Sequence, residues 1–345
     1  MMDFSDLEKT ILNRIQRDFP LSRDPFEEMA SELHMSGAEF LDSLRSLKAR
    51  SIIRTIAGIF NAGRLGYISL LAAFQVDDGR VDEAAGIINS HPGVSHNYLR
   101  DHRYNIWFTL AADSREKIDK AVQYLAERAG AASYLVLRNE RLFKIGVFLD
   151  TGCGDSPAPA HAAPSISPAD AGEKDLSREQ KEAIRLLQAD LPLFPGPFGR
   201  LIDENAGLIN EDDLLDYSRS LMQEGVMRRY SAVLRHVQAG YTANALTVWK
   251  PGTGADIDRV AGIFHARTLV SHLYLRSAWP DEWDYPLFAM IHGRTDEELS
   301  RVIRELSRES GLAQYQVLRT MREFKKERVV YFSPRFKEWE DEAGI

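Results

Sequence analysis

The chain contains one polar motif twice. The first copy reads Ser-His-Asn-Tyr-Leu-Arg at 95–100, and the second reads Ser-His-Leu-Tyr-Leu-Arg at 271–276, 176 residues further along. A second motif, Tyr-Leu-Val-Leu-Arg at 134–138, returns as Tyr-Gln-Val-Leu-Arg at 315–319, 181 residues further along. Solenoid units repeat every ~20–50 residues, so this spacing indicates duplication of a whole multi-element module. Because His, Tyr and Arg are repeated, and not only apolar residues, the duplication also predicts a repeated site.

The composition restricts the class of protein. The chain has 345 residues, more than the ~100–200 of one domain, so several domains are expected. Its net charge of −8 argues against a nucleic-acid binder, which needs clustered Lys and Arg. The single cysteine, Cys153, excludes an intrachain disulfide and a cysteine-rich metal site. With no leader pattern and no apolar run of ~20 residues, we expect a cytoplasmic protein that does not enter a membrane.

The two halves are separated by residues 151–173, which are rich in Pro, Ala, Gly and Ser and are predicted to form a flexible linker. Each half opens with three helical segments, the third of which begins at a capping Ser36 or Asn210. A short β ribbon should follow each third helix. This order is typical of winged helix-turn-helix domains, which we place at 1–65 and 174–240.

The rest of each half, 66–150 and 241–345, has the strand and helix order β-α-β-β-α-β of a ferredoxin-like domain. A further strand is predicted after each, at 142–149 and 328–332. The fold class is therefore α+β, a tandem duplication of a winged helix-turn-helix plus a ferredoxin-like module.

Residues two apart in a strand share a face, so each motif should present a His-Tyr-Arg stripe. The two stripes are His96, Tyr98, Arg100 and His272, Tyr274, Arg276. Arg can bind a carboxylate through two hydrogen bonds, His can hold a proton near neutral pH, and Tyr can donate a hydrogen bond while packing on a ring. The alternative is the solvated face of an antiparallel sheet.

Other polar residues recur or lie near the stripes. The candidates are His102, Tyr104, His292, Arg138, Arg319 and, in the ribbon, Arg54. His102 follows the first stripe closely, which favours the first half as the productive one. The sequence has neither zinc-ligand spacing nor a phosphate-binding glycine loop.

The domain order resembles the Lrp/AsnC transcription regulators. The segment 91–109 is similar to the signature of one siroheme decarboxylase subunit, and 271–276 with 279–293 is similar to that of the other. Asp284 and Pro286 depart from the second signature, in which a Tyr-Asn pair is expected. The family uses two Lrp-like subunits, and here both are fused.

The resemblance implies removal of the C12 and C18 acetate carboxyl groups of siroheme, which gives 12,18-didecarboxysiroheme for haem or haem d1 synthesis. It implies no cofactor, since the iron enters with the substrate, and two halves packed as a pseudo-heterodimer, with further dimerisation possible. The implied catalytic residues are His96, His102, His272 and Tyr104. The implied substrate contacts are Arg100, Tyr98, Arg276, Tyr274, Arg138, Arg319, Arg54 and His292.

Two other functions stay open, a transcription regulator and a non-catalytic haem-binding protein. The third helix of the second half, at 210–224, has five acids and one cation, so it could hardly approach DNA phosphates. We therefore expect no specific DNA binding. A haem-binding protein would share the same site, and only turnover distinguishes it.

Overall fold

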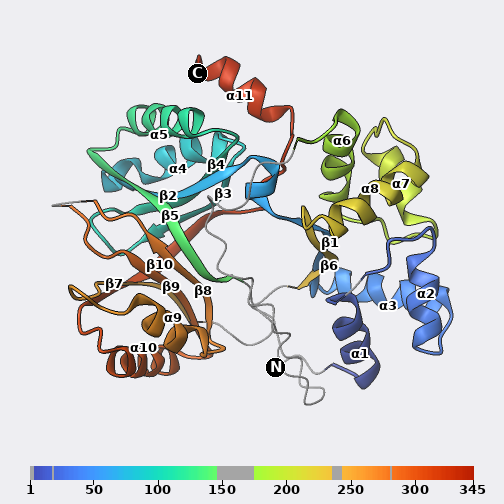
Figure 1. Cartoon of the computed structure of the whole chain (residues 1–345), viewed down its shortest axis with the longest axis horizontal. Helices are drawn as coiled ribbons and strands as arrows, with labels where there is room; N and C mark the ends of the chain where they lie inside the picture. Colours follow the sequence, from blue (N-terminus) through green and yellow to red (C-terminus); the bar gives the residue numbers. More distant parts are fainter. Residues whose placement is uncertain (1–3, 18, 146–174, 235–242, 280–281) are drawn as a thin grey trace.

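The computed structural model describes residues 4–17, 19–145, 175–234, 243–279 and 282–345 (Figure 1). The predicted linker and Cys153 lie outside these residues. Each half begins with three helices and a strand. They are α1 (Asp6–Ile15), α2 (Pro25–Glu32), α3 (Gly37–Ala49) and β1 (Ile53–Phe60), then α6 (Arg178–Leu187), α7 (Pro197–Glu204), α8 (Glu211–Gln223) and β6 (Met227–Leu234). No helix among the described residues is long and apolar enough to cross a membrane.

The ribbon is shared between the two halves. β1 pairs with β6 in antiparallel order, with Ile56 opposite Ala232, so each half supplies one strand. The expectation of one ribbon per half is corrected here, because the chain after β1 does not turn back. It enters a 3₁₀ turn, Ala62–Leu65, and continues into the first strand of the ferredoxin-like sheet. The edge of β1 is therefore free to pair with β6 of the other half. One hydrophobic core then extends through all six helices.

The ferredoxin-like domains hold the remaining strands and helices. In the first half these are β2 (Ile68–Gln75), α4 (Val81–Ser90), β3 (Val94–Arg100), β4 (Ile106–Ala112), α5 (Arg115–Ala129) and β5 (Ser133–Ile145). In the second half they are β7 (Ala243–Trp249), α9 (Ile257–His265), β8 (Val270–Arg276), β9 (Leu287–Gly293), α10 (Asp296–Ser310) and β10 (Tyr315–Lys326), followed by α11 (Arg335–Ala343). The predicted order of elements is confirmed in both halves.

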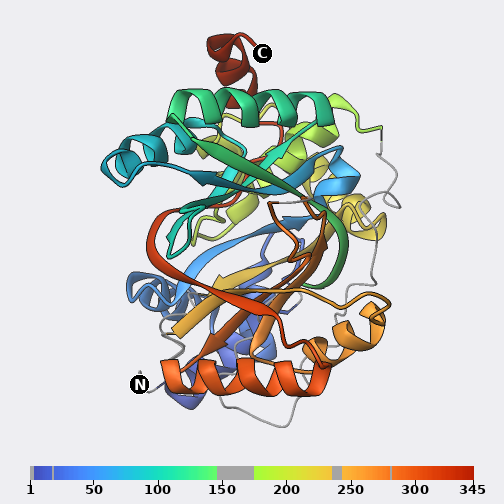
Figure 2. The same ribbon diagram turned by 90° about the vertical axis from the view of Figure 1, so that its left-hand side faces the viewer.

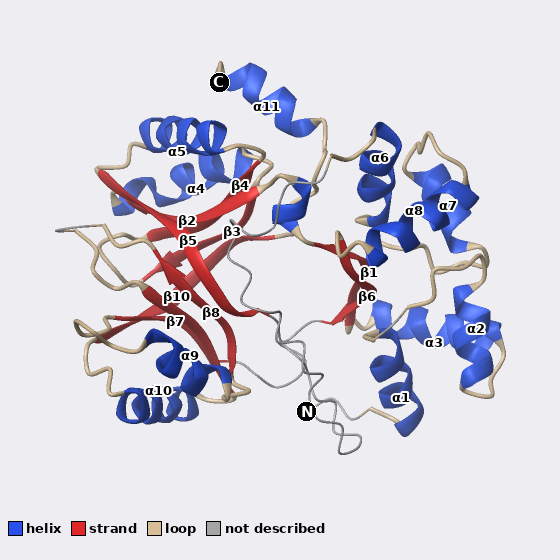
Figure 3. Ribbon diagram, in the orientation of Figure 1, coloured by secondary structure: helices blue, strands red, loops and turns tan. Residues whose placement is uncertain are grey.

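The two sheets close into one eight-stranded barrel in the order β10-β3-β4-β2-β5-β8-β9-β7 (Figure 3). β5 and β10 make this closure, because each runs past its own sheet and pairs with β8 or β3 of the other half. Residues 142–145 of the strand predicted separately at 142–149 are thus the end of β5, and residues 146–149 lie outside the described residues. The strand predicted at 328–332 is wrong: these residues form no strand and pack through Tyr331 and Phe332 on Tyr67.

The helices α4 and α5 cover one outer face of the barrel, and α9 and α10 cover the opposite one (Figure 2). Alternation along β2 shows both layers: Leu70 and Phe74 pack beneath the helices, whereas Leu71 and Ala73 point into the barrel. An inner core of apolar and aromatic side chains, including Trp107 and its neighbours, fills that interior. The barrel is therefore a packed body with helices outside.

The last helix, α11, crosses from the second half and packs on the first. The Trp339 ring lies 4.2 Å from the His91 ring, and its Nε1 donates to Ser90 Oγ. Lys117 and Glu340 form an ion pair across the same contact. His91 accepts a hydrogen bond from the Gly93 backbone and is buried beneath this helix.

Candidate active site

The two stripes lie on opposite sides of the barrel, since β3 and β8 are four places apart in the closed order. Both point inward: Asn97, between the first His and Tyr, bonds outward to Asn89 of α4, and Tyr274 packs on the inner core. His96 lies opposite Lys326, whose backbone carbonyl accepts a hydrogen bond of 2.8 Å from Arg54 of the ribbon. The histidine ends of the stripes thus lie at the end of the barrel that faces the ribbon (Figure 1).

His96 is half-buried, and its Nδ1 lies 2.9 Å from Ser95 Oγ. Burial, and then the positive charges of Lys326 and Arg54, lower the pKa of His96 to about 4. The imidazole is therefore neutral at neutral pH when no ligand is bound. An anion placed beside Lys326 and Arg54 would oppose their charge and raise this pKa again.

The two tyrosines keep their phenolic protons. Burial, followed by the negative charge of Glu323, raises the pKa of Tyr98 to about 12. Burial also raises the pKa of Tyr274. Both hydroxyls can therefore act as hydrogen-bond donors at neutral pH.

Arg100 and Arg276 join the two halves. Arg100 Nη1 donates to Leu318 O at 2.9 Å, and Arg276 Nη1 donates to Leu137 O at 3.2 Å, each across the seam between the sheets. Each guanidinium also lies over the Tyr ring of its own stripe. Burial lowers both pKa values to about 10, so both cations stay charged. Neither Nε has a hydrogen-bond partner among the described residues.

Five cations of the ribbon and of the chain around the end of β10 form a group that we call the cationic cluster. Its members are Arg54, Arg228, Arg229, Lys326 and Arg328. Burial raises the pKa of Tyr274, and the nearby charge of Arg228 only partly opposes that rise. Burial, followed by the charges of Arg54 and Arg229, lowers the pKa of Arg328.

Within the described residues, no ion pair involves the four arginines of the cationic cluster, and only a 3.9 Å contact to Glu323 involves Lys326. Of the five cluster residues, only Arg54 was predicted from the sequence as a site residue. A signal was available, because Arg54 and Arg228 occupy equivalent places after the third helix of each half. The cluster creates a positive field that suits a ligand with several carboxylates.

His102 and Tyr104 lie at the opposite end of the barrel. A strand rises ~3.3 Å per residue, which places Arg100 roughly 13 Å from His96 with His102 beyond it. There His102 Nδ1 accepts from the Tyr104 backbone, and its ring lies 5.7 Å from that of Trp283. The structure therefore does not bring His102 to His96, and the reason for favouring the first half is removed.

Arg138 and Arg319 lie outside the barrel. Their neighbours Leu137 and Leu318 point inward, so alternation turns both arginines toward the helices. Arg138 forms an ion pair with Asp119 of α5, and Arg319 lies 3.6 Å from Asp296 at the start of α10. The structure does not bring them to the stripes.

His292 does reach the second stripe. Ser271 Oγ lies 2.8 Å from His292 Nε2 and 2.8 Å from His272 Nδ1.

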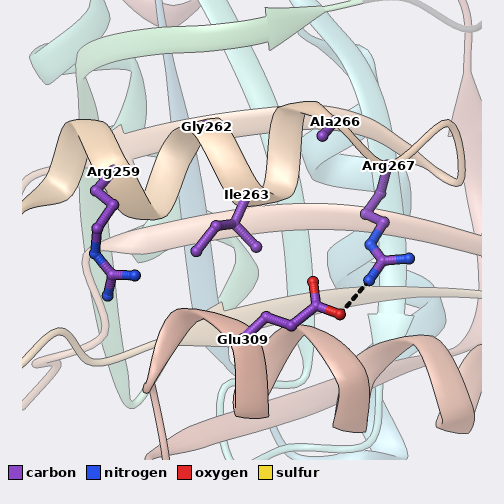
Figure 4. Close-up of a pocket in the computed structure, with 6 residues that line it drawn as sticks. All are labelled: Arg259, Gly262, Ile263, Ala266, Arg267 and Glu309. Atoms are coloured by element: carbon purple, nitrogen blue, oxygen red, sulfur yellow. Dashed lines mark hydrogen bonds and ion pairs between the residues drawn. The ribbon is translucent and has the colours of Figure 1, made fainter.

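No group of three or more His, Cys, Asp or Glu side chains that could hold a metal occurs among the described residues. A surface pocket between α9 and α10, lined by Arg259, Arg267 and Glu309, is on the outside of the barrel and away from both stripes (Figure 4).

Two winged helix-turn-helix domains and two ferredoxin-like domains closed into one barrel define a fused, two-module protein of the Lrp/AsnC class. Residues 64–144 and 238–325 match the model of the AsnC-like ligand binding domain. Residues 8–54 match the model of the siroheme decarboxylase NirDL-like HTH domain. The first match covers most of the barrel, and the second covers the first three helices.

A siroheme decarboxylase of Hydrogenobacter thermophilus is 40% identical over 95% of this chain and 96% of its own length. The crystal structure of the siroheme decarboxylase NirDL in co-complex with an iron-uroporphyrin III analogue matches at 34% identity and a TM-score of 0.77, over 98% of both chains. The chain therefore belongs to the siroheme decarboxylase family. The alpha and beta subunits of Desulfovibrio desulfuricans cover 43% and 46% of this chain, at 84% and 97% of their own lengths, with 40% and 33% identity. One chain thus holds both subunit types.

Proposed function

We propose that this protein is a carbon–carbon lyase that removes the C12 and C18 acetate carboxyl groups of siroheme and releases 12,18-didecarboxysiroheme. The observation that carries the proposal is that both His-Tyr-Arg stripes meet, at one end of the barrel, a cationic cluster without strong acidic partners among the described residues. A tetrapyrrole with eight carboxylates has the size and charge that such a surface would bind. The names of the relatives support the same substrate.

Binding precedes the chemistry in this proposal. Arg54, Arg228 and the other cluster cations hold peripheral carboxylates, and the tyrosine hydroxyls of the stripes donate to the ligand. Arg100 and Arg276 bring two more charges to the seam, each with an Nε still able to donate. We propose that no organic cofactor takes part and that the iron arrives with the substrate.

Each reaction step breaks the bond between a methylene carbon and its carboxylate. CO2 leaves, the electron pair enters the conjugated ring system, and one proton then binds the methylene carbon to form a methyl group. His96 and His272 are the proposed proton donors. His96 is neutral without ligand, but carboxylates held by Lys326 and Arg54 raise its pKa, so the substrate itself prepares the donor.

The DNA-binding alternative is disfavoured by contacts of the third helices. Arg45 of α3 donates to Leu193 O, and Arg219 of α8 donates to Leu21 O, so each helix uses a cation to hold the other half. The first turn of α8 is acidic. The absence of specific DNA binding stays a prediction, which a mobility shift at physiological salt would test.

The test of the proposed function is anaerobic incubation of the purified protein with siroheme, followed by mass analysis of the tetrapyrrole. Loss of two CO2 units without added cofactor is the expected result. Binding of siroheme with no change of its mass would instead indicate the non-catalytic haem-binding function.

A further inference from the structure

We propose that His292 and Ser271 form a proton relay to His272, which gives the second half a proton supply that the first half lacks. This inference rests on the proposed decarboxylation. Ser271 and His292 act through His272 and need not touch the substrate, so both are positioning residues.

The geometry of Ser271 carries the inference. Its side chain is buried, with 2% of the residue exposed, and its Oγ lies 2.8 Å from both His272 Nδ1 and His292 Nε2. A hydroxyl has one proton to donate and two lone pairs, so it can accept from one imidazole while donating to the other. His292 is half-buried at the ribbon-facing end of β9, where it can exchange protons with water.

The first half has the same serine but a different second partner. Ser95 Oγ lies 2.9 Å from His96 Nδ1 and 2.6 Å from Thr109 Oγ1. His96 is opposite Thr109 in the sheet, as His272 is opposite Met290. The place of His292, two residues after Met290, is therefore taken by an alanine, Ala111, in the first half. The hydrogen-bonded chain ends there at a hydroxyl that cannot hold an extra proton near neutral pH.

The relay balances the protons of one decarboxylation. CO2 leaves, and the Nε2–H bond of His272 breaks as a C–H bond forms at the methylene carbon. The Ser271 Oγ proton moves to His272 Nδ1, and the Nε2 proton of a charged His292 moves to Ser271. His292 ends neutral and recovers its proton from solution, and exchange with water restores the starting tautomer of His272 after product release.

The experiment compares three variants in anaerobic siroheme turnover. His292→Ala and His292→Gln remove the proton carrier, but Gln keeps a side-chain amide that can hydrogen bond to Ser271. Thr109→Val is the matched control, since it removes the second partner of the serine in the first half. Siroheme affinity and thermal unfolding of each variant are measured beside the rate.

Both His292 variants should bind siroheme as the wild type does and turn over roughly tenfold to 100-fold more slowly, at most the lower limit of the range for lost proton transfer. Added imidazole should restore much of the rate, and the monodecarboxylated product should accumulate. Thr109→Val should keep the wild-type rate.

Three results would overturn the relay. The first is wild-type turnover in His292→Ala. The second is a wild-type rate in His292→Gln, because Gln cannot carry a proton and this rate would show that the role of His292 is structural. A slow rate that imidazole leaves unchanged would also contradict it. If the wild-type protein itself leaves siroheme intact, the proposed function fails, and the relay that rests on it fails with it.

Discussion

At the scale of single residues, the stripes could be predicted and the cationic cluster could not. Two-residue periodicity places His96 and Tyr98 on one face without knowledge of the fold. The cluster is made by β1 of the first half and by β6, the end of β10 and Arg328 of the second half, and Arg54 and Lys326 are 272 residues apart in the chain. Only tertiary structure brings Arg54 to Lys326. For the same reason, the prediction that His102 lies beside His96 is wrong. The two residues are close in the sequence, but the extended strand between them places them at opposite ends of the barrel.

Exchange of cluster arginines should weaken substrate binding. Arg54→Gln and Arg228→Gln each remove a cation that a carboxylate would contact, so siroheme affinity should fall about tenfold or more, with a smaller loss at high salt. Absorbance titration of siroheme measures this. Arg141→Gln is the matched control, because Arg141 is already paired with Asp258. Equal siroheme affinity of all three variants would show that the cationic cluster does not bind the substrate.

Two histidines with lowered pKa values make folding stability depend on pH. Burial lowers the pKa of His91 to about 3, with a smaller effect of Lys325, and that of His96 is about 4. The unfolded chain takes up protons near pH 6.5 and the native state does not. Stability is therefore full above pH 6.5 and falls toward pH 4, by ~1.4 kcal/mol per pH unit for each histidine.

The His91→Asn variant tests this dependence. The amide oxygen can still accept from the Gly93 backbone, but it does not titrate. Denaturant unfolding between pH 7.5 and 4.5 should show a shallower loss of free energy with falling pH than in the wild type, whatever the starting stability. An unchanged slope would contradict the assignment of this pH dependence to His91.

At the scale of elements, α11 was missed because its sequence gives little signal. Arg335–Ala343 is mostly charged and has only Phe336 and Trp339 as large apolar residues. Its position follows from one buried aromatic contact and not from periodicity. Strand β5 was divided in two for a related reason: its pairing partner β8 belongs to the other half, and register shifts at Asn139/Arg141 and Leu142/Lys144 interrupt its alternation.

Removal of the α11 anchor should destabilise the first half. Trp339 is 8% exposed and packs on His91 and Tyr124, so Trp339→Ala should lower the free energy of unfolding by about 3–5 kcal/mol. Lys337→Ala on the same helix is the control, because its exposed pair with Asp341 should contribute less than ~0.5 kcal/mol. Equal unfolding midpoints for the two variants would show that α11 does not stabilise the fold.

At the scale of the whole molecule, the duplication and both modules were predicted, whereas closure of the barrel was not. The local sequence indicates that β5 and β10 are strands but does not show which sheet edge each one meets. In the structure these strands exchange between halves, and β1 with β6 adds a third seam. The halves therefore form one folded unit with a shared core.

Cleavage of the connecting segment should therefore leave the molecule intact. Limited proteolysis is expected to cut first within 151–173, where the composition predicts an exposed linker. The two fragments should elute together in gel filtration and keep siroheme binding, because three strand pairings and a shared core join them. Elution as separate halves would show that the seams are weak.

The most direct test of the central claim is a time course of the tetrapyrrole mass during anaerobic incubation with siroheme. The wild-type protein should convert siroheme to a product that has lost two CO2 units. The double variant His96→Gln, His272→Gln should bind siroheme with similar affinity and convert it at least ~10²-fold more slowly. Unchanged siroheme with the wild type, or equal conversion by the double variant, would contradict decarboxylation at these two stripes.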